Sequence, residues 1–242
     1  MNTSRKIALV FGGSRGIGAA CVQTLAGSGF DVAYTYVANP PDTAPGSGES
    51  RIEAYRVEIA ESAQVVQVFA DVRKKFGSPP HCVVANAGIN VPPAPVAQFD
   101  PDNFRRLVEI NIVGAFNVLQ EAAKQVVDGG CIIAITTSLV RFAAPGLGPY
   151  SATKGAVECL ARSMSKELAG RGVRVNAVAP GPVDTDLFRA GKDEEAIKRS
   201  AAMSPFNRVG LPHEVAEVVS FLASDKASWV HGQIVQPNGG LV

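Results

Sequence analysis

The sequence predicts an α/β fold in which a doubly wound parallel sheet of about seven strands carries helices on both faces. Three observations predict it: short apolar runs alternate with amphipathic stretches, a glycine-rich turn follows the first run, and small or polar residues follow several later runs. Strands that alternate with helices indicate a parallel sheet with right-handed crossovers. With 242 residues and 46% apolar content, the chain is expected to form one domain over residues 1–242.

Composition and charge argue against several classes of protein. The chain has 23 basic and 22 acidic residues and no basic stripe, so we expect neither nucleic acid nor a membrane as a partner. No apolar run approaches the ~20 residues of a membrane span, and the first residues lack the long apolar region of a signal peptide. The four cysteines lie far apart, without the spacing of a metal site or a disulfide framework. We expect a cytoplasmic protein without a bound metal.

The first strand is expected over Ile7 to Phe11, which leads directly into a glycine-rich turn and then a helix. A strand, a glycine turn and a helix in this order are typical of a phosphate-binding loop. The glycines let a pyrophosphate approach the backbone, and the helix N-terminus offers N–H groups to the anion. A plain strand-to-helix turn is the alternative. The predicted cofactor residues of this turn are Gly12, Ser14, Arg15, Gly16, Ile17 and Gly18.

The second strand, expected over Asp31 to Val37, bears on the choice of cofactor. Enzymes that prefer NAD usually carry an acid at the end of this strand, where it binds the ribose hydroxyls. Tyr36 stands near that end, so no carboxylate would repel a 2′-phosphate. Arg15 could pair with such a phosphate because a guanidinium matches its geometry, and a solvated loop residue is the alternative. The pattern favours NADP(H), with NAD(H) as the second choice.

A loop, a strand and a helix follow. The segment Asn39 to Ser50 holds three prolines and two glycines, which exclude a stable helix and predict a loop in place of the usual crossover helix. The third strand is expected over Ile52 to Ile59, and its end would place Glu58 or Ile59 near an adenine. Helical periodicity predicts the next element over Ser62 to Phe76.

The centre of the sheet is expected at Cys82 to Ala85, which runs into the turn Asn86-Ala87-Gly88. Doubly wound sheets bind ligands at the carboxyl ends of such central strands, and Asn86 is expected to bond to backbone there. A long helix is predicted over Phe104 to Val127, with Asn111 in its middle. Asn111 is either an exposed or capping amide, or it marks a helix kink whose freed groups hold a water.

The fifth strand, Cys131 to Ile135, ends in Thr136-Thr137-Ser138, and a helix that carries Tyr150 and Lys154 follows. Residues four apart share a helix face, so the phenol and the ammonium are predicted to lie side by side. A free tyrosine has a pKa near ~10, and a fixed ammonium would lower that pKa and make Tyr150 a usable acid or base. A chance pair is the alternative.

The last third of the chain completes the pattern. A sixth strand is expected over Val173 to Ala179 and is closed by Pro180-Gly181-Pro182, and Asn238-Gly239-Gly240 indicates a turn after a last strand near Val235. In this order, the motifs of the whole chain resemble those of the short-chain dehydrogenase/reductase family of single-domain type, including its 3-oxoacyl-carrier-protein reductases and carbonyl reductases. The resemblance implies a Rossmann-like, NAD(P)-binding domain.

The resemblance also implies catalytic roles. Tyr150 would be the general acid or base on the substrate oxygen, and Lys154 would lower its pKa and bind the nicotinamide ribose. Ser138 would hold the same oxygen against developing charge. Asn111 would hold a water that links Lys154 to solvent. Cofactor contacts are implied for Asn86, Ala87, Gly88, Tyr150, Lys154, Pro180, Gly181, Val183 and Thr185.

Further expectations follow from the same resemblance. Residues 183–210 would form a lid over the substrate, and the protein would form homodimers or homotetramers. Two motifs depart from the family pattern: Phe11 stands where the glycine turn often opens with threonine, and Ala85 replaces the first of two asparagines. An enoyl reductase would need a longer tyrosine–lysine spacing, and Val157 stands where that lysine would be.

The predicted function is an NADP(H)-dependent oxidoreductase that transfers a hydride between nicotinamide and a ketone, an aldehyde or a secondary alcohol. The nicotinamide supplies the hydride chemistry, and the protein supplies position and charge. A non-catalytic NADP-binding sensor or regulatory module is the alternative, although a sensor has no need to keep all four predicted catalytic residues. The sequence names neither the substrate nor the direction of the reaction.

Overall fold

The computed structural model describes residues 5–38 and 49–242, and its centre is one sheet of seven parallel strands. The strand order is β3-β2-β1-β4-β5-β6-β7, which confirms the predicted doubly wound sheet. The chain winds outward from β1 to one edge and from β4 to the other, so ligands are expected where these two strands part. The strands are β1 Ile7–Phe11, β2 Asp31–Tyr36, β3 Ile52–Arg56, β4 Cys82–Ala85, β5 Cys131–Ile135, β6 Arg174–Val178 and β7 Ile234–Val235.

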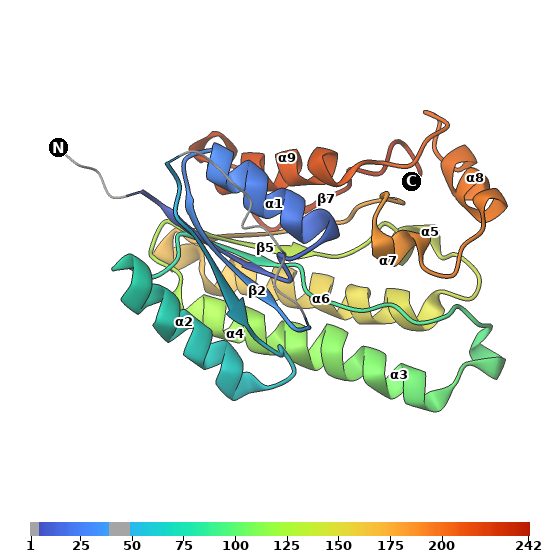
Figure 1. Ribbon diagram of the computed structural model, residues 1–242, viewed down its shortest axis with the longest axis horizontal. Coiled ribbons are helices and arrows are strands. Elements are labelled where there is room, and N and C mark those ends of the chain that lie inside the picture. Colours follow the sequence, from blue (N-terminus) through green and yellow to red (C-terminus); the bar gives the residue numbers. More distant parts are fainter. Residues whose placement is uncertain (1–4, 39–48) are drawn as a thin grey trace.

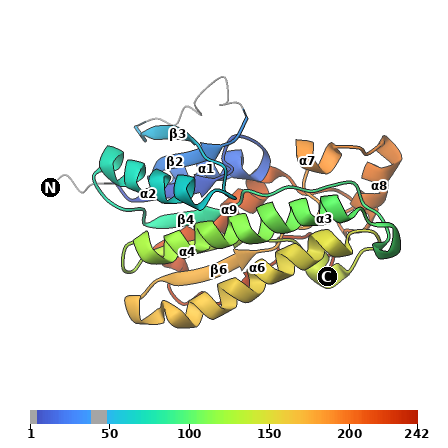
Figure 2. The ribbon, with the colours of Figure 1, turned by 90° about the horizontal axis from the view of Figure 1, so that it is seen from below.

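Helices cover both faces of the sheet, as Figures 1 and 2 show. On one face α1 and α9 bury Leu25 and Leu222 against the strands. On the other face α2, α4 and α6 bury Val68, Leu119 and Val157 in a second core. The α-helices are α1 Gly16–Gly27, α2 Ser62–Phe76, α3 Pro101–Val108, α4 Ala115–Gln125, α5 Leu139–Phe142, α6 Gly148–Glu167, α7 Asp186–Arg189, α8 Glu194–Ala202 and α9 Pro212–Ala223.

The long helix predicted over Phe104 to Val127 differs most from the structure. It begins earlier, at Pro101, because the Asp100 carboxylate caps it by accepting a backbone N–H of the first turn at 2.8 Å. A π-helical turn, Glu109–Gly114, then interrupts it and separates α3 from α4. Such turns are frequent at functional sites, and Asn111 lies in this one.

The third strand ends at Arg56, three residues before its predicted end. The chain turns inward there, and the Ile59 side chain is buried in the core. It packs so closely under Gly114 that a Cβ on that glycine would lie 2.7 Å from Ile59 Cγ1. The loop predicted over Asn39 to Ser50 lies outside the described residues, apart from its last two.

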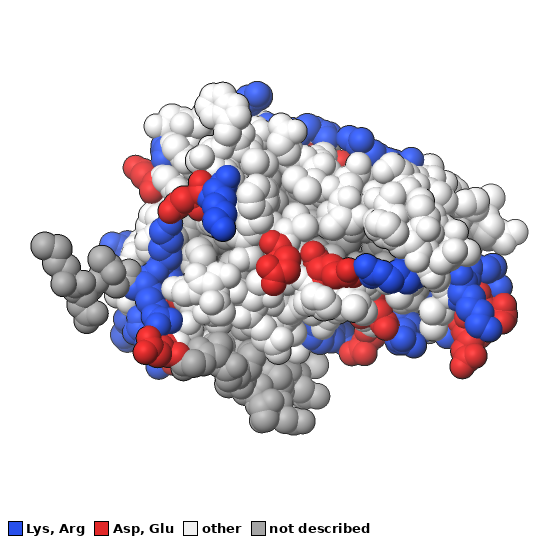
Figure 3. Space-filling model, turned by 90° about the horizontal axis from the view of Figure 1, so that it is seen from above, with Lys and Arg blue, Asp and Glu red and all other residues white. Residues whose placement is uncertain are grey.

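The surface carries charges of both signs. On the face shown in Figure 3, lysine and arginine are interspersed with aspartate and glutamate and form no single basic band. This mixture agrees with the formal net charge of +1. Among the helices in residues 5–38 and 49–242, none combines the length and the apolar character that crossing a membrane would require.

Candidate active site

The glycine turn after β1 is fastened on both sides. The N–H groups of Gly12 and Gly13 donate to the hydroxyl and the carbonyl of Thr35, at 3.0 Å and 2.9 Å. From the other side, Asn86 Nδ2 donates to the carbonyls of Phe11 and Gly12, at 3.2 Å and 2.9 Å. The prediction that Asn86 bonds to backbone is therefore confirmed. These bonds fix the shape of the turn between β2 and β4.

The helix α1 begins immediately after this turn. Arg15 is its N-cap residue, with an extended backbone and no capping bond from its side chain, which is exposed. The first N–H groups of a helix lack internal partners and carry a partial positive charge, so they favour an anion. The turn and helix together have the arrangement of a phosphate-binding loop, with Arg15 at its rim.

A cavity of about 620 Å³ adjoins the carboxyl ends of β4, β5 and β6. Its walls come from the segments that follow these strands and from residues 183–210. It brings together the predicted site residues Ile17, Asn86, Gly88, Ser138, Tyr150, Lys154, Pro180, Gly181, Val183 and Thr185. The other predicted cofactor residues do not line it and lie in the glycine turn, in the first turn of α1, in the turn after β4 or at the ends of β2 and β3. They are Gly12, Ser14, Arg15, Gly16, Gly18, Tyr36, Glu58, Ile59 and Ala87.

Tyr150 and Lys154 lie one turn apart near the start of α6. Lys154 is 6% exposed, and its Nζ donates to the carbonyl of Ile135 at 3.0 Å. Burial lowers the pKa of Lys154 to about 8 and raises the pKa of Tyr150 to about 12. The pKa of Tyr150 is therefore raised where the sequence predicted that it would be lowered, because burial removes hydration that the charged phenolate needs.

Ser138 follows β5 and is 1% exposed. Its Oγ donates to the carbonyl of Ala179 at 2.7 Å, and its N–H donates to the carbonyl of Pro180 at 2.9 Å. These two bonds hold the end of β5 against the end of β6. Because the hydroxyl proton is used by Ala179, Ser138 has only lone pairs left for the cavity. The hydroxyl must turn before it can donate to a substrate oxygen.

Asn111 is buried in the π-helical turn, and its amide is bound to the segment after β4. The N–H of Ile89 donates to Asn111 Oδ1 at 2.8 Å, and Asn111 Nδ2 donates to the Ile89 carbonyl at 2.9 Å. The π-helical turn supports the interpretation that Asn111 marks an interruption of the helix, and the alternative of an exposed amide is wrong, while a water held there stays a prediction. A Cβ on Gly88 would lie 3.0 Å from Asn111 Oδ1 and 3.3 Å from Lys154 Nζ. Gly88 thus leaves room at the point that both polar groups adjoin.

Two further groups of the site were not predicted from the sequence. Thr153 Oγ1 donates to the Tyr150 carbonyl at 2.7 Å and accepts from Asn111 Nδ2 at 3.2 Å, which joins α6 to the π-helical turn. Its place directly before Lys154 is the one signal that could have pointed to it. The carbonyl of Ile135, which holds Lys154, belongs to the backbone and has no signature in the sequence.

The segment after β6 forms the outer wall of the cavity. Thr185 Oγ1 accepts the N–H of Phe188 at 3.1 Å and thereby caps α7, which competes with its predicted bond to a carboxamide. The N–H of Asp184 donates to the carbonyl of Gly210 at 2.9 Å, so the two ends of residues 183–210 are held together. Between these ends, Leu187, Phe188, Ala190 and Met203 line the cavity.

The ends of β2 and β3 lie on the same edge of the sheet as the glycine turn. Tyr36 is half-buried, and Arg56 is its partner in the strand register. Glu58 follows, and its N–H donates to Gln64 Oε1 at 2.9 Å. Ile59 is 3% exposed and packed in the core, and its carbonyl accepts from Asn117 Nδ2 at 2.9 Å, so its side chain is not free to meet an adenine.

Comparison with known proteins adds independent evidence. A family model described as enoyl-(acyl carrier protein) reductase matches residues 12–242. A short-chain type dehydrogenase/reductase of Picea abies is 40% identical over 251 residues, which cover 98% of this chain and 92% of the relative. An NADPH-dependent aldehyde reductase-like protein of Arabidopsis thaliana, described as chloroplastic, is 37% identical over 254 residues, with coverage of 98% and 94%.

Solved structures agree. A crystal structure of a short chain dehydrogenase from Burkholderia cenocepacia in complex with NADP is 28% identical, with a TM-score of 0.87 and 99% of each chain covered. This similarity supports the predicted Rossmann-like fold. The matched family model and relatives cover nearly the whole chain, including every residue of the candidate site. The chain belongs to the short-chain dehydrogenase/reductase family of enzymes.

Proposed function

We propose that this enzyme reduces a ketone or an aldehyde with NADPH, or oxidises the corresponding alcohol with NADP. The observation that carries the proposal is that Ser138, Tyr150 and Lys154 line one cavity, beside the turn that begins α1. The Arabidopsis relative is described as NADPH-dependent, and the Burkholderia structure is a complex with NADP. Both descriptions support NADP(H) as the cofactor.

The residues present fit a dinucleotide along the carboxyl edge of the sheet. The glycine turn and the first N–H groups of α1 would hold the pyrophosphate, and Pro180 to Thr185 would flank the nicotinamide. Lys154 would bind the nicotinamide ribose, and Arg15 would pair with the 2′-phosphate. When bound, NADPH supplies the hydride. The fastened glycine turn and the room beside Gly88 support this placement.

Tyr150 is the proton donor in the direction of reduction. A pKa of about 12 keeps its hydroxyl protonated at neutral pH, ready to give the proton to the carbonyl oxygen. Ser138 holds that oxygen once its hydroxyl turns from Ala179. Lys154 stabilises the tyrosinate that remains, and Asn111 would hold a water through which a proton returns; the position of Asn111 Oδ1 near Lys154 beside Gly88 supports this role.

Carbonyl chemistry is favoured over enoyl chemistry by the spacing of Tyr150 and Lys154. The longer spacing of an enoyl reductase would require a lysine at Val157. That side chain is 2% exposed, is packed in the core between α6 and the sheet, and does not line the cavity. The description of the matched family model therefore indicates kinship rather than the reaction of this enzyme.

The substrate is proposed to be an apolar carbonyl compound under a lid. Residues 183–210 form that lid on a single dinucleotide-binding domain, because they carry α7 and α8 between two ends that are bonded to each other. Closing such a lid excludes water from the reaction. Apolar side chains that line the cavity beyond the nicotinamide segment are Val91, Leu139, Leu147, Leu187, Phe188 and Met203.

Homodimers or homotetramers are also proposed, through an apolar hollow on the outer side of the π-helical turn and α6. Val113 and Phe116 are 37% and 43% exposed there, and exposed apolar patches mark partner surfaces. Light scattering checks this proposal with a Phe116→Glu variant. The wild type is expected to associate and the variant to dissociate, and a monomeric wild type would contradict the proposal. The residues of the hollow are Ile112, Val113, Phe116, Ala156, Cys159, Leu160 and Ser163.

A panel of chemically diverse ketones and aldehydes, each supplied with NADPH and with NADH, tests the reaction. We expect turnover with NADPH that is fastest for apolar carbonyl compounds. Tight NADPH binding without turnover of any carbonyl or alcohol would instead favour the non-catalytic sensor. The panel also identifies the substrate class, since the rates report which carbonyl groups reach Tyr150.

A further inference from the structure

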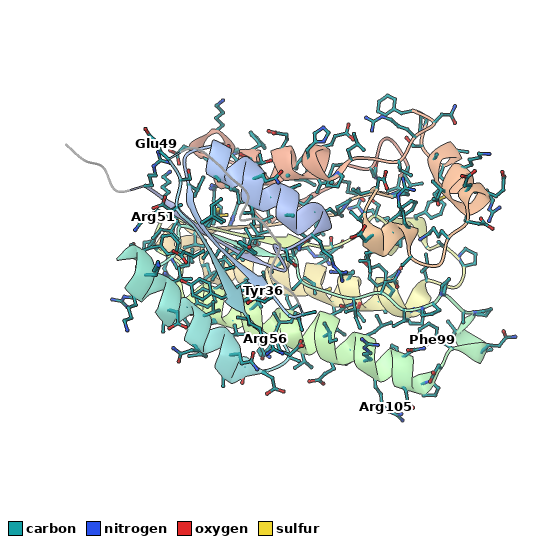
Figure 4. The ribbon with its side chains drawn as sticks, viewed as in Figure 1. Tyr36, Glu49, Arg51, Arg56, Phe99 and Arg105 are labelled. Atoms are coloured by element: carbon teal, nitrogen blue, oxygen red, sulfur yellow. The ribbon has the colours of Figure 1, made fainter. Side chains whose placement is uncertain are left out.

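Two arginines at the ends of β3 have different surroundings. Arg51, directly before the strand, pairs with the buried Asp31 at 2.6 Å and lies over the ring of Phe76, 5.0 Å from its centroid. Arg56, at the end, is exposed, and its Nε donates to the carbonyl of Val37 at 3.1 Å. No carboxylate in residues 5–38 and 49–242 forms a salt bridge with Arg56. Figure 4 shows the two arginines at opposite ends of the strand.

The strand register places Arg56 on the face of the sheet that α1 covers. Tyr36 and Arg56 are direct partners in the parallel ladder, so their side chains leave the sheet on the same side. Tyr34, two residues before Tyr36, belongs to the core formed with α1. Side chains alternate along a strand, so Tyr34 and Tyr36 share a face. Arg56 therefore stands on the face from which the glycine turn and α1 rise.

The glycine turn adjoins Tyr36 from the opposite side. The sheet order β3-β2-β1 puts β2 between the strand of Arg56 and the strand that leads into the turn. The bonds of Thr35 to the turn hold it against the end of β2. Arg15, Tyr36 and Arg56 thus follow one another across the carboxyl edge, with the tyrosine in the middle.

We propose that Arg56 is a second arginine of the site for the 2′-phosphate of NADP(H), on the other side of Tyr36 from Arg15. A phosphate monoester carries about −1.5 to −2 charges at neutral pH, so it can pair with two guanidinium groups. Among residues 5–38 and 49–242, the side chain of Arg56 forms one hydrogen bond, from Nε to the Val37 carbonyl, and both terminal nitrogens of the guanidinium remain as donors there. The inference rests on the proposed use of NADP(H) and adds a residue that decides cofactor selectivity.

Binding measurements without any carbonyl substrate test this assignment. Titration calorimetry with NADPH, NADH and adenosine 2′,5′-bisphosphate would compare the wild type with Arg56→Ala and Arg56→Gln. We expect both variants to bind NADPH and the bisphosphate about tenfold more weakly, because one charge-assisted contact with the phosphate is lost. The affinity for NADH should change by less than about twofold. Glutamine retains an amide that can bond to Val37, so this variant keeps the test valid if alanine impairs folding.

Arg105→Ala is the matched control. Arg105 is an exposed arginine on α3 that pairs with Asp102 at 2.6 Å, and Figure 4 shows it away from Tyr36 and Arg56. Arg105→Ala removes the same positive charge as Arg56→Ala, and we expect it to leave the affinities for NADPH, NADH and the bisphosphate unchanged. If Arg105→Ala and Arg56→Ala weaken NADPH binding equally, the effect comes from the net charge of the protein, and the assignment of Arg56 to the 2′-phosphate is wrong.

Three other results would also overturn it: unchanged NADPH affinity in the Arg56 variants, equal weakening of NADPH and NADH, or no NADPH binding by the wild type. Failure of the proposed reaction looks different. If no carbonyl is reduced while the Arg56 variants selectively lose affinity for NADPH, the phosphate role of Arg56 is supported and the proposed reductase function is wrong. If NADPH-dependent turnover proceeds and the selectivity is unaffected, the reductase stands and Arg56 has no part in it.

Discussion

The two ends of the proposed dinucleotide site hold their polar groups in different ways. At the cavity end, Asn111, Ser138 and Lys154 are at most 6% exposed, and each is bonded to a backbone carbonyl. At the adenosine end, Arg15 and Arg56 are exposed at the rim of the sheet. The first arrangement fixes positions for chemistry, and the second recognises charge. Changes at the cavity end should therefore alter rate and stability, and changes at the adenosine end should alter affinity.

Removal of the proposed proton donor, the Tyr150 hydroxyl, should have the largest effect at the cavity end. Tyr150→Phe deletes the hydroxyl and keeps the ring, so we expect the rate constant for carbonyl reduction to fall by about 10³-fold or more. The NADPH dissociation constant should change by less than about twofold, because the ring still fills its place. Steady-state rates and calorimetric titration check the two parts. Activity that survives this substitution would contradict the proposed mechanism.

A pH profile tests the role of Lys154. Its pKa of about 8 means that the ammonium is lost above that pH, so the rate of reduction should fall about tenfold for each further pH unit. Initial rates from about pH 6 to about pH 10 at saturating NADPH measure this. Lys154→Arg stays charged, so its remaining activity should not show the fall. A wild-type profile that stays flat above pH 8 would count against the assignment.

The lowered pKa of Lys154 also affects stability, which should rise with pH where the rate of reduction falls. The pKa of Lys154 is lowered in the folded protein from an ordinary value of 10.5, so between about 8 and 10.5 the unfolded chain binds more protons. The contribution of Lys154 to folding is complete above pH 10.5 and is lost as the pH falls through about 8. Comparison with a Lys154→Met variant isolates the contribution of Lys154 to the free energy of unfolding. This contribution should rise with pH across the range in which the rate of carbonyl reduction falls.

Asn111→Ala should reduce stability as well as rate. It leaves the N–H and the carbonyl of Ile89 without their partner, and we expect the free energy of unfolding to fall by about 2 kcal/mol. Asn117→Ala is a suitable comparison, because Asn117 Nδ2 also donates to backbone carbonyls, those of Ile59 and Ala60, whereas Asn111 adjoins the same point beside Gly88 as Lys154. Urea unfolding should show a loss in both variants, and the rate should fall only in Asn111→Ala. A normal rate in that variant would remove Asn111 from the mechanism.

Arg15→Ala should have the smallest of these effects and be confined to the cofactor. We expect about tenfold weaker binding of NADPH, nearly unchanged binding of NADH, and unchanged turnover once NADPH is saturating. Dissociation constants for both cofactors measure this difference. Equal losses for NADPH and NADH would contradict the phosphate assignment of Arg15.

Sequence reasoning succeeded where a local pattern carries the information. The spacing of Tyr150 and Lys154 places both on one helix face, and the strand before Gly12 leads into the turn as expected. It failed where distant parts of the chain decide the outcome. The direction of the Tyr150 pKa depends on burial by several segments, and Gly114, at the end of the π-helical turn, packs against Ile59 from a distant part of the chain. The end of β3 moved for the same reason, because Ile59 is drawn into the core.

The bonds from Thr35 to the glycine turn bear on how the enzyme could be re-engineered or could evolve. They join two backbone N–H groups to β2 without using any side chain of the turn itself. Arg15, Tyr36 and Arg56 can therefore be exchanged while the loop keeps its shape, so one dinucleotide could replace another within the same scaffold. Thr35→Val would instead remove the hydroxyl that accepts the Gly12 N–H, and we expect it to weaken the binding of NADPH and of NADH alike.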